Sequence, residues 1–424
     1  MIGPWQWLAL PILEPVTPTR HLKAFTGYGI EMEYMIVDRD SLTVRPLCDR
    51  LIEAVEGEVV NETDQGRLAW SNELVLHVIE LKTNGPAPSL DGLSEAFSHD
   101  IQRINQLLVA ESAMLMPTAM HPLFDPERET RLWPHGQNEI YAAYNRIFDC
   151  RGHGWSNLQS THINLPFADD EEFVRLHAAI RIVLPLIPAL AAASPIIAGR
   201  ATGWHDSRLD CYRRNQQRIP EIAGQIVPEP VHSITDYHRR ILEPMYRAIA
   251  PHDPDEILAD DWLNSRGAIA RFERQTIEIR IVDIQECPAA DIAIASAIVG
   301  LVRALYDETL APLAAQQAIA TEELAAGLMA TARHGAGARM DCPELARLLG
   351  VPLANRAGDW WAHLGDRVGL APGCPVGLFE RLLQRGDLAA AILDRLGVEP
   401  TRPAIVECYR ELAECLSSNR LFLP

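Results

Sequence analysis

Alternating apolar and polar residues predict four β-strands in this chain. Their expected bounds are residues 27–38, 72–83, 157–167 and 274–284. Successive side chains of a strand point to opposite faces, so each segment would have one apolar face and one face that carries charged or polar groups. We expect the apolar faces to pack on a core and the polar faces to lie together on the other side of a sheet.

The segment at residues 29–34, GIEMEY, places two acidic residues on its polar face. Alternation puts Glu31 and Glu33 on one side of the strand and Ile30 and Met32 on the other. Neighbouring carboxylates repel each other, so this face of the sheet requires positive charge nearby.

The last expected strand has the same design. Ile277, Ile279 and Ile281 form its apolar face, whereas Glu278 and Arg280 lie on its polar face. Taken alone, such a pair is typical of a salt bridge on a solvated sheet. Together with the charged groups of the other three strands, it favours a shared polar site.

Helical periodicity separates the strands and dominates the second half of the chain. A helix is expected over residues 89–112, with Ser89 as its N-cap, and a longer helical region over residues 169–198. Residues 252–261 are rich in Asp and predict an acidic surface loop. From about residue 289 onward the Ala- and Leu-rich sequence predicts helices. These helices are interrupted at four residues, which are Gly335, Pro352, Pro372 and Pro400.

The strands are spread between long helical insertions and do not form short βαβ units. This arrangement favours an α+β fold, with a mostly antiparallel sheet, helices on one side of it and a helical C-terminal part. We expect an N-terminal extension at residues 1–24, a main domain at residues 25–310 and a helical C-terminal region, residues 311–424, that packs on the same domain.

The balance of charged residues argues against several classes of protein. The chain has 424 residues and a net charge of −19, so a broad nucleic-acid-binding surface is not expected. Of its 38 basic residues only Lys23 and Lys82 are lysines. The phosphate-binding motif G-x-x-x-x-G-K-[ST] is absent from the sequence. Any bound phosphate would therefore be held by arginine and divalent metal ions.

The sequence favours a soluble, cytoplasmic protein with no membrane partner. Its eight cysteines are scattered without a C-x-x-C pair, so we expect them to be reduced. Residues 182–199 are uncharged over nearly the length of a membrane span, but their three prolines favour a buried core helix instead. The oligomeric state stays open, and a homo-oligomer is compatible with the sequence.

Five glutamates on or near the expected strands point to a metal site. They are Glu31, Glu33, Glu73, Glu80 and Glu278. If they converge, their ionisation is suppressed without cations, and Mg²⁺ or Mn²⁺ is the natural partner of several carboxylates. His162 on the third strand is either a further ligand or a satisfied core histidine. On one regular strand Glu73 and Glu80 would face opposite sides, so either a bulge intervenes or Glu73 precedes the strand.

These charged motifs resemble those of the glutamate–cysteine ligases, and most closely the bacterial family 2 of carboxylate–amine ligases. The matching segments, in chain order, are residues 29–33, Glu73 with residues 80–83, residues 120–124, 159–162, 192–195, 207–208 and 277–283. They cover roughly residues 25 to 300. The strand around His162 departs from the family's H-V-H-V-G pattern, because Ser160 replaces the first histidine and Asn164 replaces the glycine.

The resemblance implies a glutamine-synthetase-like fold, in which a curved, mostly antiparallel sheet forms an open funnel that binds ATP and divalent ions on its concave face. Residues 25–310 would be the catalytic domain. The implied metal ligands are Glu31, Glu33, Glu73, Glu80, His162 and Glu278. Arg280 and Glu278 would be catalytic, and Arg280, Arg208 and Asn164 would contact the nucleotide. Tyr144, Arg146 and Arg208 would contact the substrates.

The family's reaction requires no protein nucleophile. ATP phosphorylates a carboxylate, and an amine then displaces phosphate from the acyl phosphate. We expect glutamate as the carboxylate and cysteine or another amino acid as the amine, as in glutathione biosynthesis. Two alternatives stay open, namely a phosphotransferase like the guanidino kinases and a non-catalytic nucleotide-binding protein.

Overall fold

An eight-stranded antiparallel sheet organises the computed structural model, which describes residues 21–353, 355–369 and 377–423. The strand order is β2-β3-β4-β1-β6-β10-β9, and β5 pairs with β1 outside this path. The strands are β1 (Gly29–Asp38), β2 (Glu62–Asp64), β3 (Leu68–Asn72), β4 (Val78–Thr83), β5 (Ala113–Met116), β6 (Ser160–Pro166), β9 (Ala268–Arg271) and β10 (Thr276–Asp283). A separate two-stranded ribbon pairs β7 (Ile196–Ile197) with β8 (Arg200–Ala201).

Three of the four predicted strands are confirmed, as β1, β6 and β10. The prediction of one strand over residues 72–83 is wrong, because residue 72 ends β3 and a turn separates it from β4. Glu73 therefore lies before β4 and not on it, which is one of the two alternatives that the sequence left open. β2, β5 and β9 were not predicted, because each has at most four residues and too short a pattern to recognise.

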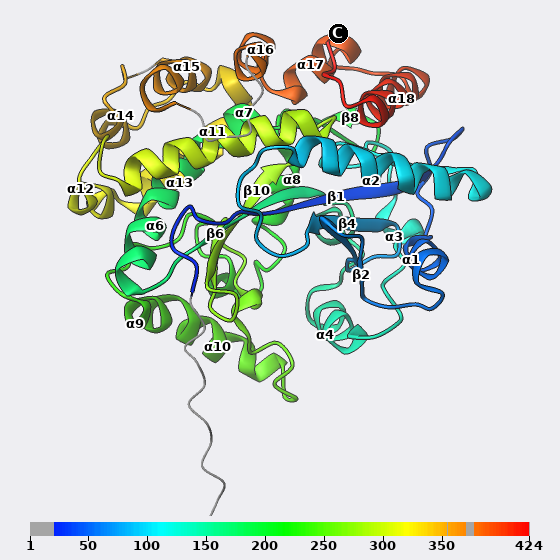
Figure 1. Cartoon of the computed structure of the whole chain (residues 1–424), viewed down its shortest axis with the longest axis horizontal. Coiled ribbons are helices and arrows are strands. Elements are labelled where there is room, and N and C mark those ends of the chain that lie inside the picture. Colours follow the sequence, from blue (N-terminus) through cyan, green and yellow to red (C-terminus); the bar gives the residue numbers. More distant parts are fainter. Residues whose placement is uncertain (1–20, 354, 370–376, 424) are drawn as a thin grey trace, which may run out of the picture.

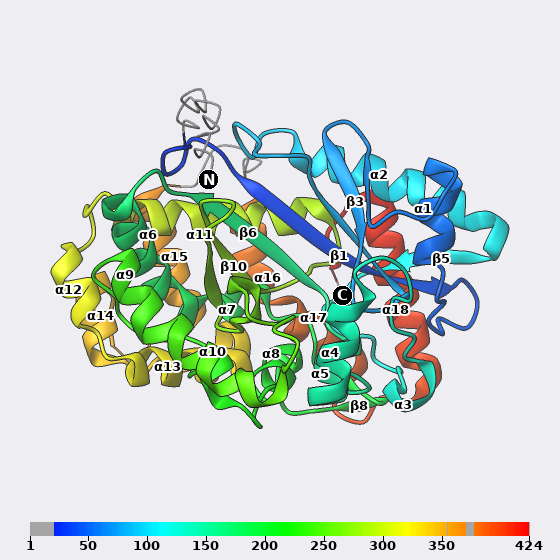
Figure 2. The same cartoon turned by 90° about the horizontal axis from the view of Figure 1, so that it is seen from below.

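Two long helices cover the apolar face of the sheet. α2 (Leu93–Leu107) and α11 (Pro288–Tyr306) pack against each other, and Figure 1 shows both on one side of β1. The side chains of Ile30 and Met32 are fully buried beneath this layer. The alternation of apolar and charged residues in β1 thus separates a covered face from a polar face, as the sequence predicted. Seen from below in Figure 2, β1 and β6 lie side by side across the molecule.

Seven α-helices follow α11 in the described part of the chain, and most of them form a further layer beyond α2 and α11 (Figure 1). They are α12 (Leu313–Ala318), α13 (Thr321–His334), α14 (Pro343–Leu349), α15 (Ala357–Val368), α16 (Leu378–Arg385), α17 (Leu388–Leu396) and α18 (Arg402–Ser418). α18 contacts both α2 and β5, and α15 and α16 contact α11. The α+β class with a helical C-terminal part is therefore confirmed.

The remaining helices lie between the strands in sequence. They are α1 (Cys48–Glu56), α3 (Pro126–Glu129), α4 (Asn138–Phe148), α5 (His153–Ser156), α6 (Asp170–Val183), α7 (Pro188–Ala191), α8 (Ser207–Tyr212), α9 (Ile234–Tyr237) and α10 (Glu243–Ile249). Several short helical turns connect them, among them η2 (Leu184–Leu186) and η6 (Asp261–Leu263). Some positions named in the sequence predictions lie outside the described residues. They are residues 1–20 of the expected extension, Pro372 and Cys374.

Two predicted helices differ from the structure in their bounds. Ser89 is not an N-cap: its hydroxyl pairs with Asp91, and α2 begins only after Gly92, which has a positive φ of 68°. The helical region over residues 169–198 is divided into α6, η2 and α7, because Pro185 and Pro188 interrupt its backbone hydrogen bonds. Residues 182–196 of this apolar segment are buried in the protein interior.

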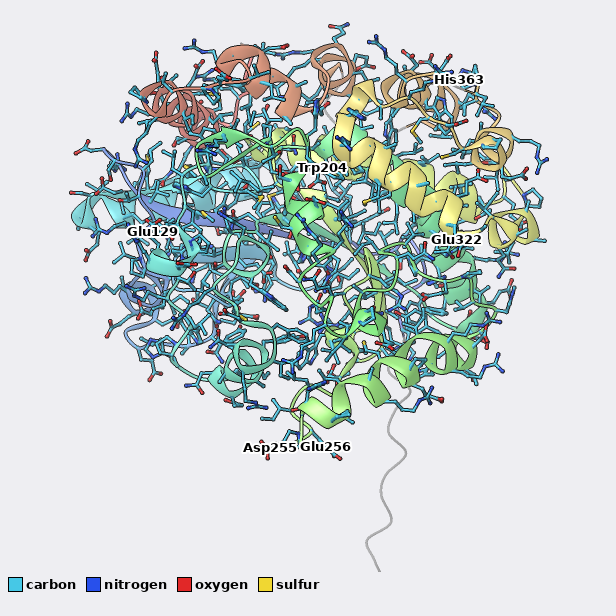
Figure 3. The ribbon with its side chains drawn as sticks, turned by 180° about the vertical axis from the view of Figure 1, so that it is seen from behind. Glu129, Trp204, Asp255, Glu256, Glu322 and His363 are labelled. Carbon is cyan, nitrogen blue, oxygen red and sulfur yellow. The ribbon has the colours of Figure 1, made fainter. Side chains whose placement is uncertain are left out.

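The acidic loop predicted over residues 252–261 lies at the surface in its central part. Asp255 and Glu256 are exposed, and Figure 3 shows them at the rim of the molecule, after α10. Within the described residues, α11 alone is long and apolar enough to cross a membrane by length and composition, and most of its apolar window is buried inside the protein.

A buried carboxylate joins α11 to the apolar face of the sheet. Asp291 Oδ1 accepts hydrogen bonds from Thr161 Oγ1 at 2.7 Å and from the Gln285 N–H at 3.1 Å. Burial raises the pKa of Asp291 to about 8, although these two hydrogen bonds oppose the shift. An unfolded aspartate has a pKa of about 3.9, so between these values the folded protein holds a proton that the unfolded chain has released.

We expect Asp291→Asn to become increasingly stabilising as pH rises from about 4 to about 8. In the wild-type protein this proton linkage lowers the free energy of unfolding over that range, whereas asparagine accepts the same hydrogen bonds and does not titrate. Thermal melting of both proteins across this pH range tests it, with Asp255→Asn on the exposed loop as control. A difference in Tm that does not change with pH would contradict the raised pKa.

Candidate functional site

The register of the central strands brings the predicted acidic residues together on the polar face. Glu31 of β1 lies opposite Lys82 on β4 and His162 on β6, and Glu33 lies opposite Glu80. On the next strand pair, Asn164 of β6 lies opposite Glu278 of β10. Side chains that are directly opposite across antiparallel strands lie close together, so the sheet itself assembles this cluster.

Two adjoining cavities open on this face. One, of about 430 Å³, is lined by all six of the predicted metal ligands, Glu31, Glu33, Glu73, Glu80, His162 and Glu278, and by Arg280. We call it the carboxylate cavity. The other, of about 530 Å³, includes apolar groups such as Leu22, Tyr28 and Pro86, together with Asn164. We call it the mixed cavity. Both cavities are lined by Glu31, Glu62, Lys82 and Arg274, which mark their boundary.

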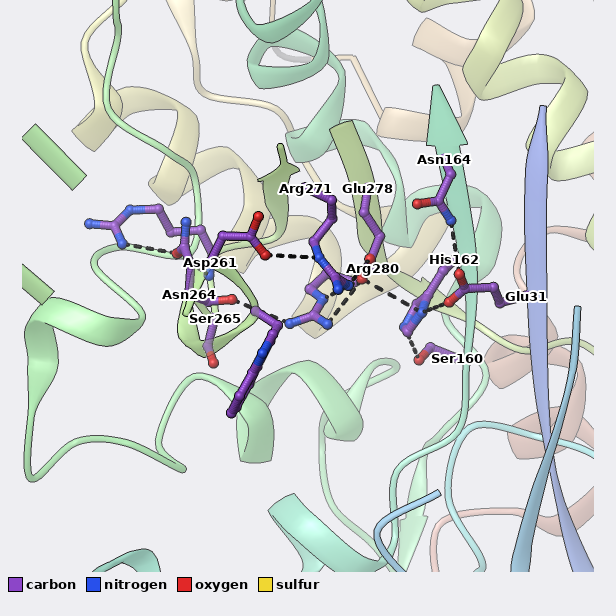
Figure 4. A network of polar contacts seen from close by, with 12 residues as sticks. Glu31, Ser160, His162, Asn164, Asp261, Asn264, Ser265, Arg271, Glu278 and Arg280 are labelled. Carbon is purple, nitrogen blue, oxygen red and sulfur yellow. Dashed lines mark hydrogen bonds and ion pairs between the residues drawn. The ribbon is translucent and has the colours of Figure 1, made fainter. Parts of the chain in front are cut away.

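His162 joins two of the carboxylates through hydrogen bonds. Its Nδ1 lies 2.8 Å from Glu31 Oε2, and its Nε2 lies 2.9 Å from the Ser160 hydroxyl (Figure 4). The Ser160 N–H and hydroxyl in turn donate to Glu33 Oε2, at 2.7 and 3.0 Å. Burial disfavours the protonated ring, but the hydrogen bond to Glu31 and the nearby charges of Glu33 and Glu278 raise the pKa of His162 to about 9. The Glu31 carboxyl is also buried, and His162 lowers its pKa to about 2.

Glu278 is held by arginines on its own strand and on β9. Its side chain is 2% exposed, and its Oε1 accepts from Arg280 Nε at 3.0 Å. Its Oε2 accepts from Arg271 Nη1 at 3.1 Å. Burial opposes ionisation of Glu278, yet Arg280 is close enough to lower the net pKa of this carboxyl. Arg280 also donates to the Asn264 carbonyl at 3.3 Å, so Figure 4 shows its guanidinium between Asn264 and Glu278.

Three glutamates at the other end of the carboxylate cavity repel one another. Burial and the charges of Glu80 and Glu33 raise the pKa of Glu73, and burial and Glu31 raise that of Glu80. One oxygen from each of Glu33, Glu73 and Glu80 lies within 4.8 Å of the other two, and Glu31, Glu80 and His162 form a second such group. Carboxylate oxygens at this spacing suit Mg²⁺ or Mn²⁺, so the residues present fit a divalent metal.

The other predicted site residues have different positions. Arg208 is 2% exposed, forms a buried ion pair with Asp283 at 2.5 Å and does not line either cavity. Arg146 is exposed on α4, away from both cavities. Tyr144, also on α4, packs against Trp155 and Trp262, and Arg280 lies close enough to lower its pKa in part, although burial raises it overall. Asn164 donates to Glu31 at 3.1 Å and lines the mixed cavity.

Several basic residues of the site were not predicted from the sequence. Lys82 Nζ lies 2.8 Å from Glu62 and 3.1 Å from Glu80, and Arg274 Nη1 lies 3.7 Å from Glu31. Alternation gave a signal for Lys82, since it is two residues after Glu80 on the same strand. Arg271 gave no such signal, because its strand β9 has only four residues.

The model of glutamate–cysteine ligase family 2 matches residues 28–351. The chain belongs to this family. Its matched segment contains the residues that line the carboxylate cavity, from Glu31 to Arg280.

The related proteins differ in the share of their length that aligns with this chain. An uncharacterized protein of Archaeoglobus fulgidus is 33% identical over 395 residues, which are 93% of this chain and 100% of that protein. A Bradyrhizobium sp. BTAi1 protein, provisionally named glutamate–cysteine ligase 2, is 26% identical over 66% of this chain and 62% of its own length. This match therefore spans less than two thirds of the named relative.

The chain shares its fold with a solved structure. The glutamate–cysteine ligase of Francisella tularensis, solved in complex with AMP, aligns with a TM-score of 0.54 at 13% identity, over 94% of this chain and 90% of the other. At this identity the likeness concerns the fold.

We expect Glu73→Gln to weaken Mn²⁺ binding at least about ten-fold, because it removes one of three converging carboxylates. The metal-free protein should melt at the same or a higher temperature, since the substitution also removes charge repulsion with Glu80 and Glu33. Calorimetric titration with Mn²⁺ and thermal melting measure the two effects. Glu256→Gln at the exposed rim is the control, and equal Mn²⁺ affinity in both variants would rule out Glu73 as a ligand.

Proposed function

We propose that the protein is an ATP-dependent carboxylate–amine ligase that forms a γ-glutamyl amide from glutamate and an amino-acid amine such as cysteine, with release of ADP and phosphate. The observation that carries this proposal is the pair of adjoining cavities on the polar face. The mixed cavity offers apolar and polar groups for a nucleoside. The carboxylate cavity offers metal ligands, and Arg280 lines the same cavity. Their shared boundary would then be crossed by the phosphate chain. Membership of the family supports the same reaction class.

Divalent ions are expected in the carboxylate cavity, with Glu33, Glu73 and Glu80 as one ligand group and Glu31, Glu80 and His162 as the other. When bound, Mg²⁺ or Mn²⁺ would offset the charge of the phosphate oxygens and the mutual repulsion of these carboxylates. Glu278 is already paired with Arg280 and Arg271, so a metal contact from Glu278 would compete with two arginines.

The two chemical steps need positioning and charge more than they need a protein nucleophile. In the first, an oxygen of the substrate carboxylate attacks the γ-phosphorus of ATP and ADP leaves. In the second, the amine nitrogen attacks the acyl carbon, loses a proton and displaces phosphate. Arg280 is 19% exposed and directs a planar guanidinium into the cavity that holds the metal ligands. A planar donor fork suits the equatorial oxygens of a phosphoryl group during transfer. Lys82 and Arg274 lie at the boundary where the phosphate chain would pass.

The cysteines are not expected to take part in this chemistry. Seven of them lie in the described part of the chain, all with free thiols, and six of these are buried. None lines either cavity. Because the attacking group belongs to the substrate amine, an enzyme thiol has no role in the proposed steps.

Supplied with ATP, Mg²⁺, glutamate and each amino acid in turn, the protein should form ADP, phosphate and one amide in equal amounts. A coupled ADP assay finds the active amine, mass spectrometry identifies the amide, and excess EDTA should abolish turnover. A phosphorylated substrate without an amide would indicate a phosphotransferase. Nucleotide binding without turnover for any pair would indicate a non-catalytic binder, and either result would reject the ligase.

We expect Arg280→Lys, which keeps the charge but loses the donor fork, to lower kcat roughly ten-fold or more with a modest change in the KM for ATP. Steady-state kinetics measure both parameters. The control is Arg247→Lys, because Arg247 is 70% exposed, lines neither cavity and should tolerate lysine with little loss. Full kcat with a sharply raised KM for glutamate would instead make Arg280 a clamp for the substrate carboxylate.

A further inference from the structure

Strand β10 contains a bulge at Arg280, the arginine that is proposed above to contact the transferred phosphoryl group. Ile279 lies opposite Ile163, but Val282 lies opposite Thr161, so β10 uses one more residue than β6 over this stretch. The extra residue allows Asp283 to lie opposite Ser160 on the polar side, although it is five positions from Glu278. Bulges of this kind turn a side chain in a chosen direction, and they persist only when their backbone groups find partners elsewhere.

The backbone groups of Arg280 find these partners outside β6. Its N–H donates to the Gly267 carbonyl at 3.0 Å, and its own carbonyl accepts from Arg208 Nη1 at 3.4 Å. At Gly267 a Cβ atom would lie 3.0 Å from a methyl group of Ile281, so a larger residue there would require that side chain to shift. The backbone of Arg280 thus has two partners at the bulge, and one of them is the side chain of Arg208.

Arg208 is itself held by a buried network. Asp283 Oδ1 accepts from Arg208 Nε at 2.5 Å, and Asp283 Oδ2 accepts from Ser194 Oγ at 2.8 Å and from the Ala193 N–H at 2.9 Å. The Ser194 hydroxyl also accepts from the Arg208 N–H at 3.1 Å. Asp283 and Ser194 are fully buried, and this network joins the end of β10, the segment after α7 and the start of α8 through direct hydrogen bonds.

We propose that Arg208 is a positioning residue, which Asp283 and Ser194 hold so that it fixes the β10 bulge and with it the guanidinium of Arg280. The inference rests on the proposed function in so far as Arg280 acts on the transferred phosphoryl group. It also gives one role to three sequence motifs of the chain, at residues 192–195, 207–208 and 277–283. A displacement of about 1 Å in a positioned group lowers a rate substantially, so a contact that acts through one intervening residue, Arg280, matters to kcat.

The kinetic test combines Arg208→Lys with Arg280→Lys. Lysine keeps a positive charge beside Asp283, but its single ammonium cannot reproduce both Nε–H to Asp283 and Nη1–H to the Arg280 carbonyl. Arg208→Lys should lower kcat roughly ten-fold with little change in the KM for ATP. Because Arg208 acts through Arg280, the double variant should be no more than about two-fold slower than the slower single variant.

The matched control is Arg181→Lys, which alters another fully buried arginine that donates to a backbone carbonyl, that of Pro228 at 2.6 Å. Arg181 does not line either cavity. Any effect of Arg181→Lys on kcat should multiply with that of Arg280→Lys. If the effects of Arg208→Lys and Arg280→Lys also multiply, the proposal is overturned. An Arg208→Lys variant with unchanged kcat and a raised substrate KM would likewise overturn it, in favour of a direct contact.

A second measurement is independent of turnover. Hydrogen exchange in peptides that cover β10 should be faster in Arg208→Lys than in the wild-type protein, and unchanged in Arg181→Lys. If Arg208→Lys does not fold, Ser194→Ala removes one support of the same network and should give the same change at smaller amplitude. Unaltered exchange in β10 would overturn the proposal. Absence of turnover with every substrate pair would reject the ligase function, and the exchange experiment would still decide the role of Arg208.

Discussion

The pairing of β1 with β4 and β6 is the constraint on which the site depends. It sets Glu31 between Lys82 and His162 and Glu33 opposite Glu80, so carboxylates from different segments are held at fixed spacing on one face. A shift of one residue in this register would turn these side chains into the apolar layer and bring Ile30 and Met32 to the surface. The burial of those two side chains under α2 and α11 makes such a shift costly. The apolar core thus maintains a spacing that electrostatic repulsion alone would disrupt.

The polar face balances its negative charge in two different ways. Around Glu278 the compensation comes from the protein, through Arg280 at 3.0 Å and Arg271 at 3.1 Å. Around Glu73 the compensation is incomplete: the charge of Lys82 opposes the shift, but burial and the neighbouring carboxylates raise the pKa of Glu73 overall, so the acidic group is under-neutralised. This asymmetry separates a side of the carboxylate cavity suited to a metal from a side suited to phosphate oxygens. The proposed reaction needs both, because it brings a substrate carboxylate close to a polyphosphate.

Period-two alternation was sufficient to predict the residues that lie on regular strands. It placed Glu31, Glu33 and Glu278 on the polar face, because each belongs to a strand long enough to show the pattern. For Glu73 it allowed either a bulge in the strand or a position before it, and in the structure Glu73 lies before the turn that leads into β4. The sheet and its helical cover follow from the same reasoning, since apolar strand faces require a helical layer and the sequence supplies long apolar helices.

The features that the sequence did not predict depend on contacts between distant segments. Arg208 and Asp283 are 75 positions apart, and no local pattern indicates that they form an ion pair. The bulge in β10 changes which side chains share a face, and its backbone groups at Arg280 bond to Gly267 and Arg208, which lie outside the strand. The resemblance suggested a substrate contact for Arg208, because motif matching identifies a residue without showing what it touches.

Lys82 shows why one basic residue of the site differs from the others. The chain uses arginine almost everywhere, yet at the boundary of the two cavities it has a lysine whose Nζ lies 2.8 Å from Glu62 and 3.1 Å from Glu80. A guanidinium is broad and planar with several fixed donors, and two of them, from Arg280 and Arg271, contact Glu278 at its two oxygens. An ammonium is a compact charge with three donors, and it fits between carboxylates that belong to different strands. In this respect an ammonium group resembles a metal ion more closely than a guanidinium group does. The two kinds of basic residue therefore match two arrangements of negative charge. Lys82 lies between the carboxylates of two strands, whereas Arg280 and Arg271 each contact a different oxygen of the one carboxylate of Glu278.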